Sequence, residues 1–203
     1  MSEDSPTHPI DEMSTTTPDD VVSPADKSVD ALVSLVERGA GIDLRNGMAS
    51  DDDPALIDTE RATLVTRDAG DLVDSLATRL ADAGAIVAVL PHIDSAVVQA
   101  VQSDVRPAAS STDIRIVFVE PARTRISGPR GTAIRAALKA QSIDWYASDV
   151  SAPVGLLLAD EHAVVGGFDD GRLETALLST DDVIRSWVAE TCRRYLRSAD
   201  PRA

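Results

Sequence analysis

Residues 152–196 decide the fold of this chain, and they read APVGLLLADEHAVVGGFDDGRLETALLSTDDVIRSWVAETCRRYL. Two apolar runs, 154–159 and 163–168, lack the polar alternation of a half-exposed strand, so we expect two strands that are covered on both faces. The sequence Asp169-Asp170-Gly171-Arg172 is typical of a tight turn and predicts a third strand over 173–178. Because only a few residues join these strands, they must be antiparallel neighbours.

A capped amphipathic helix ends this block. Thr180 is the expected N-cap, with Asp181 and Asp182 at the positive end of the helix dipole. Arginines in the last turns suit the negative end. The inner face is predicted to consist of Ile184, Trp187, Val188, Thr191 and Tyr195.

Upstream of this block, strand patterns alternate with helix patterns. Apolar runs predict strands over 61–66, 85–90, 113–119 and 143–147. Helical spacing predicts helices over 70–83, 94–105 and 132–141. Strands separated by such helices form parallel sheets with right-handed crossovers. The predicted fold class is therefore α/β, a three-layer mixed sheet with a C-terminal antiparallel meander and a final amphipathic helix.

Three segments are expected along the chain. Residues 1–27 have few large apolar side chains and predict a disordered acidic tail. Residues 28–53 predict a short helix, with Ser28 as its cap and Gly39 as its end, followed by an acidic linker. Residues 54–203 are expected to form the α/β regulatory domain.

The charge is large and uneven. The net charge of the 203 residues is −15, and residues 1–53 hold 13 acids against 3 bases. Aspartate far outnumbers glutamate, and Lys27 and Lys139 are the only lysines. This composition is typical of haloarchaeal proteins, whose acidic surfaces cost little self-repulsion when salt screens them. An acidic mesophilic protein is the alternative.

The sequence contains few residues that could bind a metal ion and no long apolar segment that could enter a membrane. The single cysteine, Cys192, excludes an internal disulfide, and three scattered histidines argue against a zinc site. The longest apolar runs are too short to span a bilayer, and the acidic N-terminus lacks a signal-peptide core. We expect a cytoplasmic protein with no metal, no cofactor and no membrane contact.

Phosphodiester cleavage is the first enzymatic hypothesis, because a histidine lies between two apolar strands at 154–168. That chemistry needs His and Lys at alternate strand positions, so that the imidazole attacks phosphorus and the ammonium stabilises charge. His162 is followed by Ala163 and Val164, so the lysine is missing. We expect His162 to be an exposed turn residue and no residue to be catalytic.

The best binding residues follow two predicted parallel strands. His92 and Asp94 come after strand 85–90, and Glu120 and Arg123 come after strand 113–119. Open α/β sheets place ligands at such carboxyl ends of strands. Structural roles are the alternative, with Asp94 as a helix cap. A second anion site is conceivable at 127–131, where a glycine-rich turn precedes a helix, although a plain turn is favoured.

The closing block resembles a known family. The strand beginning Pro153-Val154-Gly155, the segment Gly167-Phe168-Asp169 and the helix with Trp187 resemble the effector domain of archaeal winged-helix transcription regulators, the methanogenesis regulatory protein middle domain family. The resemblance covers about 60–200 and is weaker at its start, around Leu90-Pro91-His92-Ile93-Asp94. It implies a domain that senses a ligand or dimerises, attached to an N-terminal winged helix. Here an acidic tail and a short helix stand in that place.

The leading hypothesis is therefore a regulatory domain that binds a small, anionic metabolite near His92, Asp94, Glu120 and Arg123, or a partner. That partner is a second copy in a homodimer or a winged-helix regulator. The alternatives are a DNA-associated transcription regulator acting through a dimer or partner, and a hydrolase of unknown substrate. Direct DNA binding has little support, because the arginines of 185–202 suit a helix end and aromatic content is 3%.

Overall fold

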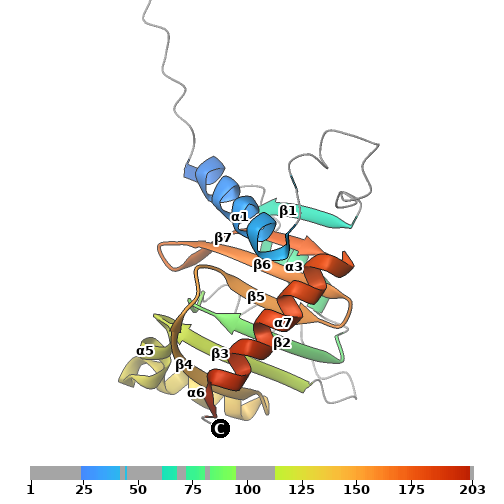
Figure 1. The fold of residues 1–203 in the computed structure, drawn as a ribbon. Helices are drawn as coiled ribbons and strands as arrows, with labels where there is room; N and C mark the ends of the chain where they lie inside the picture. Colours follow the sequence, from blue (N-terminus) through green and yellow to red (C-terminus); the bar gives the residue numbers. More distant parts are fainter. Residues whose placement is uncertain are drawn as a thin grey trace, which may run out of the picture.

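A mixed sheet with helices on both faces forms the core of the protein in the computed structural model (Figure 1). The structure describes residues 24–41, 44, 61–67, 72–80, 83–94 and 113–201. The described strands are β1 (Ala62–Thr66), β2 (Ala85–Leu90), β3 (Asp113–Glu120), β4 (Asp144–Ser151), β5 (Gly155–Ala159), β6 (His162–Asp169), β7 (Arg172–Ser179) and β8 (Asp200–Pro201). The described helices are α1 (Pro24–Ala40), α3 (Leu72–Leu80), α5 (Ala122–Ser127), the 3-10 turn η2 (Pro129–Gly131), α6 (Thr132–Ala140) and α7 (Asp182–Ser198).

The strand order confirms the mixed sheet. Across the sheet the order is β1-β7-β6-β5-β2-β3-β4-β8. The pairs β2–β3 and β3–β4 are parallel, and the other five pairs are antiparallel. Strand β1 runs in the same direction as β2, yet the whole meander β5-β6-β7 lies between them. The closing meander predicted from residues 154–178 therefore occupies the centre of the sheet.

The three predicted layers are present. On one face, α1 and α7 pack against the sheet and share a core that includes Val36, Val165 and Val188. On the other face, α5 and α6 cover β3 and β4, with Ile126 and Leu138 buried between them. On that same face α3 packs Leu72 and Leu76 against β6 and β7. The two central strands β5 and β6 are thus covered on both sides, which explains their unbroken apolar sequences.

Helix α1 begins at Pro24, before the predicted cap at Ser28, and ends at Ala40, one residue beyond the predicted stop. Gly41 follows with a φ of 72°, and its N–H donates to the carbonyl of Glu37, which is how a glycine closes a helix. The side chains of Leu32 and Val36 are buried in the core that α1 shares with α7. The expected division near residue 53 stays a prediction, since 45–60 lie outside the described residues.

Helix α7 corrects the predicted cap. Asp181, not Thr180, is the N-cap, and its Oδ1 accepts from the N–H groups of Val183 and Ile184 at 2.9 and 3.2 Å. A carboxylate is favoured at the N-cap over a hydroxyl because its negative charge also interacts with the positive end of the helix dipole. Of the predicted inner face, Ile184, Val188 and Thr191 are buried, while Trp187 and Tyr195 are partly buried against the core that α7 shares with α1.

Two elements were not expected from the sequence. Helix α5 occupies 122–127, and β8 adds two residues to the edge of β4. Helix α5 has only six residues, and two arginines at 123 and 125 interrupt its apolar spacing. The predicted helix over 94–105 lies outside the described residues beyond Asp94.

Candidate functional site

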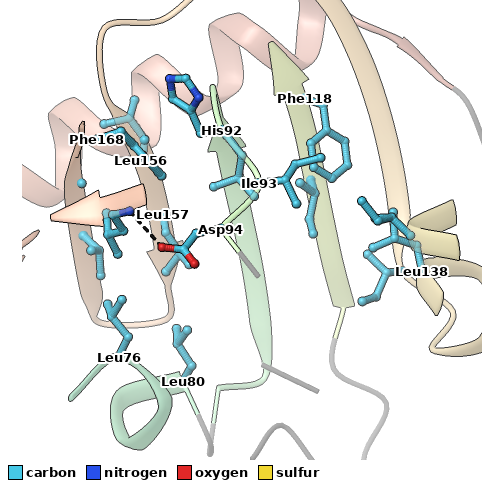
Figure 2. A pocket seen from close by; sticks show the side chains of 18 of the residues that line it. Leu76, Leu80, His92, Ile93, Asp94, Phe118, Leu138, Leu156, Leu157 and Phe168 are labelled. Carbon is cyan, nitrogen blue, oxygen red and sulfur yellow. Dashed lines mark hydrogen bonds between the residues drawn. The ribbon is translucent and has the colours of Figure 1, made fainter. Parts of the chain in front are cut away.

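An apolar cavity lies on the sheet face that α3 and α6 cover (Figure 2). Its volume is about 140 Å³, and the residues named below are those of its lining that the structure describes. Leu76 and Leu80 of α3 lie at its lower end in Figure 2, Leu138 of α6 at its side and His92 at its upper end. The remaining walls come mostly from the sheet, among them Leu90, Ile93, Ile116, Phe118, Ile143, Leu157, Val164, Phe168 and Leu173. Residues 95–112, which connect β2 to β3 along the chain, lie outside this description.

Two glycines of the central strands shape the wall of this cavity. A Cβ on Gly155 would lie 2.8 Å from the Phe168 ring, and one on Gly166 would lie 2.7 Å from Leu173 Cδ1. Because both distances are shorter than real carbon contacts, a side chain at either position would have to displace Phe168 or Leu173. The strand sequences therefore place Phe168 and Leu173 flat against the sheet, inside the cavity.

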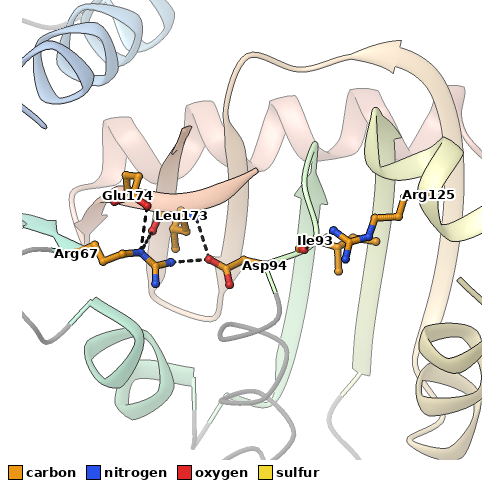
Figure 3. Close-up of polar contacts among 6 residues, drawn as sticks. All are labelled: Arg67, Ile93, Asp94, Arg125, Leu173 and Glu174. Carbon is orange, nitrogen blue, oxygen red and sulfur yellow. Dashed lines mark hydrogen bonds and ion pairs between the residues drawn. The ribbon is translucent and has the colours of Figure 1, made fainter. Parts of the chain in front are cut away.

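Asp94 holds three segments together beside the cavity (Figure 3). Its Oδ2 accepts from the Arg67 guanidinium at 2.5 Å and from the Leu173 N–H at 2.9 Å. Arg67 in turn donates to the Leu173 carbonyl at 2.8 Å and lies 3.3 Å from a carboxylate oxygen of Glu174. The Asp94 side chain is only 6% exposed and that of Arg67 25%. This ion pair ties the ends of β1 and β2 to the start of β7.

His92 lies at the end of the cavity away from Leu76 and Leu80 of α3. Its ring centroid is 5.2 Å from that of Phe168, with the planes tilted by 38°. Partial burial lowers the pKa of this histidine, because an apolar surround disfavours the charged ring. A neutral imidazole can both donate and accept a hydrogen bond.

Glu120 and Arg123 are paired with each other and do not line the cavity. Arg123 donates to Glu120 Oε1 at 2.5 Å, and the Thr124 hydroxyl donates to Glu120 Oε2 at 2.8 Å. Hydrogen bonds from Arg123 and Thr124 lower the pKa of Glu120. The Ala122 N–H donates to the Pro91 carbonyl at 2.9 Å, so the ends of β2 and β3 do meet as expected. The structure thus places His92 and Asp94 at the cavity and the Glu120–Arg123 pair beside it.

The turn over 127–131 presents carbonyl groups to an arginine. Arg135 of α6 donates to the carbonyls of Ile126 and Gly128, and Thr132 Oγ1 donates to the Pro129 carbonyl at 2.9 Å. A Cβ on Gly131 would lie 2.1 Å from the Ile126 carbonyl oxygen, so the turn requires glycine there. These contacts are typical of a packed turn, and none of them indicates an anion-binding site.

His162 begins β6, immediately after the turn, and is partly rather than fully exposed. It pairs with Ala159 across the hairpin. Among the described side chains, no group of three or more His, Cys, Asp or Glu is placed to hold a metal ion.

The sequence-based site missed the apolar residues and Arg67. Phe168 and Leu157 belong to strands that were recognised, but their direction toward one cavity depends on pairing between β5 and β6. The only signal was the glycines at 155 and 166, where a strand lacks a side chain. Arg67 lies 27 residues from Asp94, and spacing alone does not predict that contact.

The sequence model of the family described as methanogenesis regulatory protein FilR1, middle domain, matches residues 70–198. The chain belongs to this family. Its match begins close to α3 and ends with α7, so the FilR1 middle domain includes the cavity and the central meander. The resemblance of residues 152–196 to this family is confirmed. A search of curated proteins finds no match.

Solved structures resemble the fold at low sequence identity. NucT from Helicobacter pylori has a TM-score of 0.56 at 12% identity, covering 70% of this chain and 99% of that one. A phospholipase D family member, Nuc from Salmonella typhimurium, has a TM-score of 0.53 at 13% identity, covering 70% and 97%. The archaeal chromatin protein TrmBL2 has a TM-score of 0.48 at 15% identity, covering 86% of this chain. This chain spans only 61% of TrmBL2.

In the part of the chain that the structure describes, no helix has both the length and the apolar sequence needed to cross a membrane.

Proposed function

We propose that this FilR1 middle domain is the sensing module of a transcription regulator and that it binds a small apolar molecule in the cavity beside Phe168. The observation that carries the proposal is the chemistry of the cavity walls. Among the described lining residues, leucine, isoleucine, valine and phenylalanine dominate, and His92, Asp94 and Gln141 supply polar side chains. Ligand sites commonly combine such apolar walls with a few polar groups.

The size of the cavity limits the ligand. At about 140 Å³ it is close to cavities of roughly 150 Å³ that hold benzene or xenon. It is smaller than the 300–1,000 Å³ or so of drug-sized sites. The ligand is therefore a compact aromatic or branched aliphatic molecule. A single polar group on it would meet Gln141 or the neutral His92 ring.

The anionic metabolite expected from the sequence is a different proposal. The carboxylate of Asp94 faces the same cavity, and its arginine partner is already paired with it. Arg123 is likewise paired with Glu120. An apolar or weakly polar ligand fits these surroundings better than a carboxylate or phosphate, because burying an unpaired anion is costly.

We further propose that the domain acts by binding rather than by catalysis, in a cytoplasm of haloarchaeal type. The likeness to Nuc and NucT concerns the fold alone. Neither His92 nor His162 is followed two residues later by a lysine. Purified protein should not hydrolyse bis-p-nitrophenyl phosphate, and turnover above a buffer control would overturn this proposal.

Binding can be tested with two reporters already present. Trp145 is buried beside Phe118, with ring centroids 6.1 Å apart, and Phe118 lines the cavity. Trp187 lies on the opposite face against α1 and serves as an internal reference. In a Trp187→Phe background, a panel of benzene, cyclohexane and branched aliphatic alcohols should shift Trp145 fluorescence, whereas in a Trp145→Phe background the emission of Trp187 should not shift. A ligand at 100 times its Kd should add about 2.7 kcal/mol to the free energy of unfolding.

A matched pair of variants localises the effect. Ala137 lines the cavity, whereas Ala136 is exposed on the same helix. Ala137→Leu should fill the cavity and abolish the ligand response, and Ala136→Leu should leave it unchanged. The proposed ligand site is wrong if no compound in the panel gives a saturable response, or if both variants respond alike.

A DNA-associated role through a dimer or partner is the second candidate, and the family membership favours it. A gel shift with genomic fragments at high KCl tests it. Retarded fragments with the isolated chain would show direct DNA contact, which we do not expect.

A further inference from the structure

Three residues connect the wall of the cavity to the end of strand β1. Arg67 directly follows β1, Asp94 comes after β2, and Leu173 lies at the start of β7 (Figure 3). Both backbone polar groups of Leu173 take part. Its N–H donates to Asp94 Oδ2 at 2.9 Å, and its carbonyl accepts from Arg67 Nε at 2.8 Å. We call Arg67, Asp94 and Leu173 the clamp.

Two members of the clamp also line the cavity. Leu173 and Asp94 both belong to its wall, and Leu173 is only 5% exposed. A Cβ placed on Gly166 would lie 2.7 Å from Leu173 Cδ1, so this side chain already lies as close to β6 as a glycine allows. Leu173 therefore contacts the cavity with its side chain and the clamp with its backbone, and a change in its packing must act on both.

The clamp continues the attachment of β1 where its strand pairing ends. Among the described strands, β7 is the only neighbour of β1, and their pairing stops at Thr66 opposite Thr175. Beyond that point the contacts of Arg67 with Asp94 and Leu173 take over. The FilR1 middle domain match begins at residue 70, so β1 and Arg67 precede it. The clamp is thus a polar connection between the cavity and the part of the chain before that domain.

We propose that the clamp couples occupancy of the cavity to β1, so that an apolar molecule in the cavity favours the closed clamp and holds β1 against β7. The reason is electrostatic. Opening the clamp separates the Asp94 carboxylate from Arg67 and from the Leu173 N–H. Water can reach that carboxylate while the cavity is empty, but an apolar occupant excludes water, and a poorly paired buried carboxylate is costly. The occupant therefore binds the closed state more tightly, which is what shifts an equilibrium. The ligand-dependent part of this inference rests on the proposed function.

A matched pair of glycine variants tests the coupling without any ligand. Gly155 and Gly166 are register partners on β5 and β6. A Cβ on Gly166 displaces Leu173, whereas one on Gly155 lies 2.8 Å from the Phe168 ring and displaces that side chain instead. Hydrogen exchange of the full chain, read by mass spectrometry, reports local opening of β1 relative to β2. Gly166→Ala should speed exchange in β1 about fivefold or more, and Gly155→Ala should change it by less than about twofold.

Arg67→Ala identifies the route. This variant opens the clamp, so it should itself speed exchange in β1 about fivefold or more, and adding Gly166→Ala should then change little. Arg61→Ala, just before β1, is the matched control, and Gly166→Ala should keep its full effect in that background. Unchanged exchange in Arg67→Ala, or in Gly166→Ala alone, would overturn the proposal. An equal effect of Gly166→Ala with and without Arg67 would also overturn it, because the displacement would then act through Val65, which packs beside Leu173.

Benzene, at a concentration that saturates the Trp145 response, is the probe for the ligand-dependent part. It should slow exchange in β1 about fivefold or more in the wild type and have little effect on β1 in Arg67→Ala. Because coupling between two sites is reciprocal, Arg67→Ala should weaken benzene binding by a similar factor. A Trp145 signal that never responds would refute the proposed ligand site, and the glycine and Arg67 variants would still test the clamp. A saturable Trp145 response with unchanged exchange in β1 would refute the clamp and leave the ligand site standing.

Discussion

Replacing Asp94 tests how much its hydrogen bonds to Arg67 and to the Leu173 N–H stabilise the fold. Asp94→Ala removes the acceptor of the Leu173 N–H, which is buried at the start of β7. A buried donor left without a partner costs about 1–3 kcal/mol. The ion pair with Arg67 contributes about 1 kcal/mol, because that guanidinium is 25% exposed and keeps its contacts with Leu173 and Glu174. The free energy of unfolding should therefore fall by about 2–4 kcal/mol.

Equilibrium unfolding in urea, followed by tryptophan fluorescence, measures this loss. Asp94→Asn keeps an acceptor for the Leu173 N–H and removes only the charge, so it should lose about half as much. Glu120→Ala is the control, because both members of its pair with Arg123 are about a third exposed, and it should lose less than about 1 kcal/mol. A double variant with Arg67→Ala should show a coupling of about 0.5 kcal/mol or more with Asp94→Ala.

Two results would refute this reasoning. Asp94→Ala could lie within about 0.5 kcal/mol of the wild type, which would mean that the two hydrogen bonds contribute nothing net. Alternatively, Asp94→Asn could be as unstable as the alanine variant, which would assign the whole effect to charge rather than to the Leu173 N–H.

Three further predictions concern other parts of the fold. Gly39→Leu should destabilise the protein by about 1–3 kcal/mol and shift Trp187 fluorescence, because a Cβ there would lie 2.5 Å from the indole ring; Arg38→Ala, next to it, should do neither. Burial raises the pKa of Cys192 to about 12, so a thiol reagent should react only as fast as the protein opens, and reaction at the rate of a free thiol would contradict its burial. The pKa of His92 is lowered below 6.5, so the unfolded chain binds its proton first and wild-type stability should fall as pH drops through about 6.5. His92→Gln should show a smaller fall over that range, and an equal fall would assign the pH dependence to other groups.

Sequence periodicity predicted the apolar strands well, because each is short and is bounded by turn residues. It missed the polar second half of β4, which extends to Ser151 beyond the predicted end at 147. The hairpin at Asp169–Arg172 and strand β2 needed no tertiary information. The order of the strands did need it: β1 and β2 are consecutive, yet three strands of the meander separate them. The strand order depends on which apolar faces pack together in three dimensions. The alternation of strand and helix patterns along the sequence does not specify it.

The candidate site was predicted only in part, for a similar reason. The rule on carboxyl ends of strands located His92 and Asp94, and the structure places both at the cavity. The same rule selected Glu120 and Arg123, whose opposite charges pair with each other three residues apart on the surface. A sequence shows that charged residues are near strand ends, but their partners decide whether they face a ligand.

The fold of this chain is similar to that of a phospholipase D family member, which raises the question of whether the cavity could hold a phosphodiester. Cleavage of a phosphodiester develops charge in the transition state, and that charge needs polar groups positioned around it. In the described meander, the strands direct Leu157, Val164 and Phe168 at the cavity, and Gly155 and Gly166 leave room for apolar side chains. Walls of this kind would desolvate a phosphate without compensating hydrogen bonds, while they would stabilise an apolar ligand by removing it from water. These apolar side chains therefore support the proposed binding of an apolar ligand in this cavity.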